Sequence, residues 1–190
     1  MSTAIITATA QKPRLSIKMQ TLYTIGAIAA AVAVPQLFHA VGALSGAGTL
    51  PGETFLPMHL PIILVGLLAG PWAGAVAGLL GPVASFALSG MPGAAMLPFM
   101  MIELCGYGLF AGLLRNVKIP TIGKILIAQI GGRLLRAAAV LTSVYAIGST
   151  AVGVASIWMT IVKGLPGLVI QWTLLPLIVF RIENIKKNEQ

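Results

Sequence analysis

Residues 94–114 read AAMLPFMMIELCGYGLFAGLL, an apolar stretch whose only charged side chain is that of Glu103. A helix of about 20 apolar residues crosses the hydrocarbon core of a bilayer, so this stretch predicts a membrane-spanning helix. The whole chain has the same character, because 57% of its 190 residues are hydrophobic and only 8% are charged. Its mean hydropathy is +0.97, and a soluble domain carries about 25% charged residues. The sequence therefore predicts an integral membrane protein.

The chain divides into six apolar segments, separated by glycine, proline and polar residues that favour turns. The segments cover roughly residues 20–40, 55–70, 72–90, 94–114, 122–147 and 154–180. The predicted fold class is all-α: residues 1–190 form a single membrane domain, a polytopic bundle of six transmembrane helices. Residues 1–19 precede the bundle, which covers about 20–180, and residues 181–190 form a tail. A secretory signal peptide is an alternative for the first segment, but apolar residues continue past the possible cleavage site at Ala29 and Ala31, which favours a full span.

The basic residues lie mainly on one side of this topology. Nine of the twelve precede the first segment, flank the connection between the fourth and fifth segments, or follow the sixth: Lys12, Arg14, Lys18, Arg115, Lys118, Lys124, Arg181, Lys186 and Lys187. The opposite loops, around 41–54, 90–93 and 148–153, contain no lysine or arginine. The positive-inside rule then predicts a multi-pass protein of the cell membrane with both termini in the cytoplasm. The formal charge of +8 is accounted for by topology, and no nucleic-acid partner is expected.

Four charged residues remain inside the predicted spans: Glu103, Arg133, Arg136 and Lys163. An ionised side chain near the bilayer centre costs about 2.5–3.5 kcal/mol, so such residues usually face a bundle interior or a cavity. Glu103, Arg133 and Lys163 each lie nine residues from the start of their predicted helix, which corresponds to a depth of roughly 14 Å in the membrane. Arg136 follows Arg133 by one turn on the same face. One acid cannot neutralise three cations.

Two interpretations of these charges remain open. Glu103 and Arg133 form either a structural salt bridge or part of a ligand site. Arg136 and Lys163 are then in excess, which predicts a site completed by an anionic ligand, a carboxylate or a phosphate, that enters from outside. His59, Tyr107 and Gln171 are candidates for binding amide or hydroxyl groups of that ligand, although a single histidine at a helix end is often a capping residue.

No cofactor or metal site is expected. The chain has two histidines without supporting carboxylates, and its one cysteine, Cys105, cannot form a disulfide within the chain. The sequence contains neither a phosphate-binding loop nor a zinc-hydrolase or nucleophile motif. An enzyme is therefore not expected, and any ATP hydrolysis requires another chain.

Several segments together resemble a known family. Residues 55–71, FLPMHLPIILVGLLAGP, continue through Gly90-Met91-Pro92 to residues 102–108, IELCGYG, and are followed by Gly132-Arg133 and by residues 166–171, PGLVIQ. This series resembles the substrate-binding S components of energy-coupling factor (ECF) vitamin transporters, and its nearest likeness is to the branch with pantothenate and cobalamin S components.

The resemblance implies a six-helix subunit that captures a vitamin from outside, with pantothenate favoured and cobalamin or another vitamin as the alternative. It also implies ABC-type, ATP-driven uptake with a membrane coupling protein, the T component, and two ATPase subunits. Family members carry an Ala-x-x-x-Ala motif at the contact with the coupling protein, and Ala27 and Ala31 match it. A self-sufficient secondary carrier or channel is the second alternative, although residues 20–90 and 94–180 show no convincing internal repeat.

The loops on the side opposite the basic residues are expected to close over the ligand. They comprise Gly42–Thr54 and Gly90–Gly93, whose glycines and small residues permit rearrangement.

Overall fold

The structure is a computed structural model that describes residues 15–188, with side chains as far as Ile185. The elements are α1 (Ile17–Ser45), α2 (Leu50–Phe55), α3 (His59–Ala69), α4 (Pro71–Ser89), α5 (Leu97–Leu113), the 3-10 turn η1 (Leu114–Asn116), α6 (Thr121–Tyr145), α7 (Ala155–Lys163) and α8 (Leu165–Asn188). Six helical segments are long and apolar enough to cross a membrane, and α2 and α3 together make one of them. The predicted all-α fold with six spans is confirmed for the described residues.

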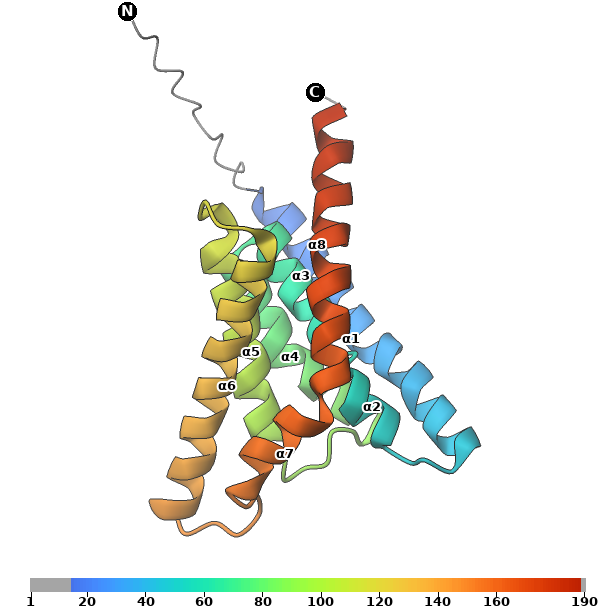
Figure 1. The fold of residues 1–190 in the computed structure, drawn as a ribbon, viewed down its shortest axis with the longest axis vertical. Coiled ribbons are helices and arrows are strands. Elements are labelled where there is room, and N and C mark those ends of the chain that lie inside the picture. The colour runs from blue at the N-terminus through green and yellow to red at the C-terminus, as the bar shows by residue number, and fades with distance from the viewer. Residues whose placement is uncertain (1–14, 189–190) are drawn as a thin grey trace, which may run out of the picture.

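Successive spans run in opposite directions through the bundle (Figure 1). The start of α1, the turn between α5 and α6 and the end of α8 lie at the top of the view, whereas α2, α7 and the loop after α4 lie at the bottom. The chain therefore passes back and forth six times between two ends. The predicted segment 1–19 and the basic residues Lys12 and Arg14 fall largely outside the described residues.

Glycines bring the central helices α3, α4 and α5 into close contact. A Cβ atom at Gly74 would overlap the backbone of Gly108, and one at Gly78 would overlap the backbone of Leu104. Small residues let helix backbones approach in this way, and the shared contact fixes the rotation of each helix. These glycines thus pack within the chain and set the position of α5, the helix that carries Glu103.

Two of the predicted spans are interrupted. Between α2 and α3 the backbone of Leu56 has a positive φ of 49°, and the two prolines of Pro57-Met58-His59-Leu60-Pro61 supply no backbone donors there. The segment expected at 154–180 is two helices, since α7 ends at Lys163 and the membrane span begins at Leu165. The two breaks meet, because a Cβ atom at Gly164 would contact Leu56 and one at Gly167 would contact the backbone of Phe55.

The small residues of α1 pack inward. Ala27 and Ala31 are 7% and 0% exposed, and a Cβ atom added at Gly81 in α4 would lie only 3.4 Å from that of Ala31. The sequence led us to expect this pair at the surface, in contact with a coupling protein. The structure buries it instead, because the absence of bulk on both helices allows α1 and α4 to pack closely.

Candidate functional site

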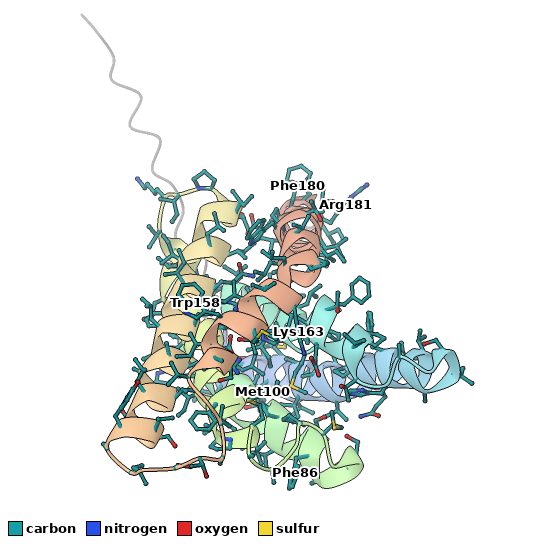
Figure 2. The ribbon with its side chains drawn as sticks, turned by 60° about the horizontal axis from the view of Figure 1, so that its bottom comes forward. Phe86, Met100, Trp158, Lys163, Phe180 and Arg181 are labelled. Carbon is teal, nitrogen blue, oxygen red and sulfur yellow. The ribbon has the colours of Figure 1, made fainter. Side chains whose placement is uncertain are left out.

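A cavity of about 380 Å³ opens at the end of the bundle where α2 and α7 lie. Side chains from every helix between α1 and α7, and from the loop Met91–Gly93, line it. Figure 2, in which the bottom of Figure 1 comes forward, places Lys163 and Met100 near the centre of the bundle and Phe86 and Phe180 at its periphery. The cavity therefore reaches from the loops into the interior of the helix bundle.

A buried ion pair forms one wall of this cavity. Arg136 Nη1 lies 2.9 Å from Glu103 Oε2, and the two side chains are 7% and 3% exposed. The hydroxyl of Tyr107 donates a hydrogen bond of 2.8 Å to Glu103 Oε1, and Arg136 Nη2 lies 3.4 Å from the sulfur of Met96. The carboxylate thus has a partner on each of its oxygens.

This pairing corrects the expectation that Glu103 binds Arg133. The reason lies in how α5 and α6 pack, since a Cβ atom at Gly132 would overlap the ring of Tyr107 and approach the backbone of Glu103. One turn outward from Gly132 along α6 is Arg136, which therefore comes opposite the Glu103 carboxylate. Arg133 is rotated away from this contact by its different position on the helix.

Arg133 lines the cavity without an anionic partner. Within residues 15–188 no ion pair or hydrogen bond of its guanidinium is found, and its buried Nε atom has no hydrogen-bond partner. Since Glu103 is paired with Arg136, the partly buried Arg133 leaves this part of the cavity with one positive charge in excess. A carboxylate or phosphate is the group that would complete it.

Lys163 lies at the rim of the cavity rather than at mid-membrane. Its Nζ atom is 2.8 Å from Glu53 Oε2, and the two side chains are 43% and 42% exposed. Thr49 donates a further hydrogen bond of 2.9 Å to the other Glu53 oxygen. The depth expected for Lys163 is wrong because it assumed a continuous helix from Val154, whereas α7 ends at this lysine.

Tyr107 and Gln171 lie outside the cavity lining. Tyr107 is fully buried and donates its hydrogen bond to Glu103. The centroid of its ring lies 5.4 Å from that of the His59 ring. The side-chain oxygen of Gln171 accepts a 2.9 Å hydrogen bond from Gln129, which in turn accepts one of 2.7 Å from Trp172. Tyr107 and Gln171, both predicted to contact the ligand, therefore bind other side chains of the bundle and do not face the cavity.

Sequence reasoning missed part of the lining. Ser85 of α4 is 1% exposed and its hydroxyl has no partner. Five of the chain's eight methionines also line the cavity: Met58, Met91, Met96, Met100 and Met159. Single serines and methionines are ordinary in apolar helices, so only their three-dimensional convergence identifies them.

The site is suited to binding rather than to metal chemistry. Among the described residues no group of three or more histidine, cysteine, aspartate or glutamate side chains could hold a metal ion. What the cavity offers is one unpaired guanidinium, uncharged polar groups such as His59, and a flexible thioether lining. Such a surface can bind a small anion with an apolar body.

Comparison with known proteins identifies the family. A family model described as "ECF transporter, substrate-specific component" matches residues 17–179, which is most of the chain. No curated protein and no solved structure matches the chain. Members of the matching family are substrate-binding membrane proteins without catalytic activity, and they act with an energising module. The chain belongs to the substrate-specific, or S, components of the energy-coupling factor transporters.

Proposed function

We propose that this S component captures a small anionic vitamin, pantothenate ahead of cobalamin, from outside the cell. The ligand carboxylate binds Arg133. This assignment rests on one observation: Arg133 lines the cavity with no partner among the described residues, while Arg136 is held by Glu103. Arg133 is partly buried, and a cation withdrawn from water is costly unless an anion completes it.

The size of the cavity supports a small ligand. Its volume of about 380 Å³ lies at the lower end of the range of roughly 300–1,000 Å³ for small-molecule sites. Pantothenate has one carboxylate, an amide and two hydroxyls on a short chain, whereas cobalamin is far larger. His59 remains a proposed contact for the amide or a hydroxyl, and Lys163 becomes a contact at the rim.

The proposed transport cycle needs further chains. Vitamin uptake is driven by a membrane T component and two ATPase subunits, to which the loaded S component docks. The termini are proposed to lie in the cytoplasm, since the basic residues of the turn between α5 and α6 and of the end of α8 belong to the end of the bundle opposite α2 and α7 (Figure 1). The cavity then opens to the outside.

Titration of the purified subunit with pantothenate, its neutral alcohol analogue and cobalamin tests the proposal. Pantothenate should bind best, and Arg133→Gln should weaken its binding by about 1.5–3 kcal/mol, the range for a hydrogen bond to a charged group. Arg181→Gln, which removes an exposed charge outside the cavity, is the matched control and should bind normally. Equal affinity for the acid and the alcohol, or binding of cobalamin alone, would reject the carboxylate assignment.

A further inference from the structure

Several buried polar atoms around the cavity lack hydrogen-bond partners. They are His59 Nδ1, Ser85 Oγ, Arg133 Nε, Arg136 Nε and Ser156 Oγ, each from a lining residue. Buried polar groups are nearly always hydrogen-bonded in folded proteins, so unpaired ones that share a cavity indicate where a ligand or water binds. The two guanidinium groups belong to the anionic end of the site, but His59 and Ser85 have no role there.

His59 and Ser85 lie at the same level of the bundle. A Cβ atom added at Gly81 in α4 would lie 3.6 Å from the side chain of Ile62 in α3. The two helices run in opposite directions, so one turn outward leads from Ile62 to His59 and from Gly81 to Ser85. Both side chains are at least 95% buried and line the cavity.

This pair lies beside the charged cluster. The ring of His59 lies 5.4 Å from that of Tyr107, which donates a hydrogen bond to Glu103. Helix α5 packs against both α4, which carries Ser85, and α6, which carries Arg133. The cavity therefore offers uncharged polar groups from α3 and α4 next to the charged groups of α5 and α6.

We infer that Ser85 and His59 form a second, uncharged subsite that binds a hydroxyl or amide of the same ligand. A serine hydroxyl donates and accepts, and the imidazole Nδ1 atom does either according to its tautomer, so the pair matches a hydroxyl group of either polarity. The inference rests on the proposed function and narrows it. The substrate is then a carboxylate that also carries a hydroxyl or amide group for this pair.

A comparison of two ligands on four proteins tests this subsite. The ligands are pantothenate and an N-acyl-β-alanine of the same carbon skeleton that lacks both hydroxyls. The proteins are the unmodified chain, Ser85→Ala, Arg133→Gln and the control Ser45→Ala, whose exposed hydroxyl bonds the Val41 carbonyl outside the cavity.

The unmodified chain and Ser45→Ala should prefer pantothenate to its deoxy analogue by about tenfold, as expected for one or two neutral hydrogen bonds. Ser85→Ala keeps His59, so its preference for pantothenate should fall by several-fold, with its affinity for the deoxy analogue unchanged. Arg133→Gln should weaken both ligands by the same factor and keep the preference.

The outcomes separate the two proposals. An undiminished preference for pantothenate in Ser85→Ala, or no preference in the unmodified chain, overturns the subsite even if discrimination between acid and alcohol persists. If the unmodified chain binds pantothenate and its neutral alcohol analogue equally but still prefers pantothenate to the deoxy analogue, the role of Arg133 is rejected and the subsite is supported. Failure of both ligands to bind overturns both proposals.

Discussion

At the scale of single residues, the Glu103 carboxylate determines the charge balance of the cavity. It accepts hydrogen bonds from Arg136 and Tyr107 in the bundle interior. We expect Glu103→Gln to lower the stability of the ligand-free protein by about 3–5 kcal/mol, because the buried Arg136 then loses its ion-pair partner. Thermal unfolding in detergent measures this loss. The double variant Glu103→Gln/Arg136→Met removes both charges and should be more stable than either single variant; additive losses would contradict a coupled pair.

The four charged residues show what sequence alone can establish about this site. Their excess of positive charge follows from counting, and the structure keeps that excess. Which cation is left over depends on the rotation of α6 against α5, and this is set by the contact of Gly132 with Tyr107. Arg133 and Arg136 are three residues apart on one helix, so no sequence pattern distinguishes their distances from Glu103.

At the scale of elements, α7 and α2 form a roof over the cavity. Ser156, Met159, Thr160 and Lys163 recur with helical spacing along the cavity side of α7. The ion pair between Lys163 and Glu53 joins α7 to α2, and Glu53 lies in the loop region expected to close over the ligand.

Breaking this roof contact should change ligand exchange more than stability. An exposed ion pair contributes about 0.2–1 kcal/mol, so Glu53→Gln, which keeps the proposed ligand contact Lys163, should raise the ligand release rate by up to about fivefold and leave the melting temperature nearly unchanged. Stopped-flow displacement of bound pantothenate measures the rate. The charge-reversed double variant Lys163→Glu/Glu53→Lys should restore slow release, and normal release from Glu53→Gln would show that the ion pair does not hold the roof.

The elements themselves were largely predictable, because long apolar runs bounded by turn residues define spans directly. The breaks within the second and sixth spans were harder to predict. Gly164 and Pro166 stand at the break before α8, but Pro35 and Pro82 lie inside continuous helices, so such residues alone do not predict where a helix ends. The break also packs against Leu56, a residue more than a hundred positions away.

At the scale of the whole molecule, the outer face of α1 is the surface we expect to meet the coupling protein. Ala27 and Ala31 are buried, but Gly26, Ala29 and Ala33 are exposed and share one face by helical spacing. We expect Ala29→Leu/Ala33→Leu to block co-purification with the energising module and to spare ligand binding. By contrast, Ala27→Leu/Ala31→Leu should lower the free energy of unfolding of the isolated chain by about 1–3 kcal/mol or more, because the larger side chains overpack the buried contact with α4. Normal assembly of the first variant would exclude this face.

The position of Arg133 also has an electrical consequence. Thr121 and Tyr145, the ends of α6, each lie twelve residues from it, so a carboxylate that reaches Arg133 from outside crosses about half of the transmembrane field. One elementary charge crossing the whole membrane involves about 2.3 kcal/mol per 100 mV. In the proposed orientation, an inside-negative potential opposes binding by about 1 kcal/mol per 100 mV and opposes the remaining inward step equally. The membrane potential therefore cannot drive uptake of an anion by this route, and the work must come from a chemical source such as nucleotide hydrolysis.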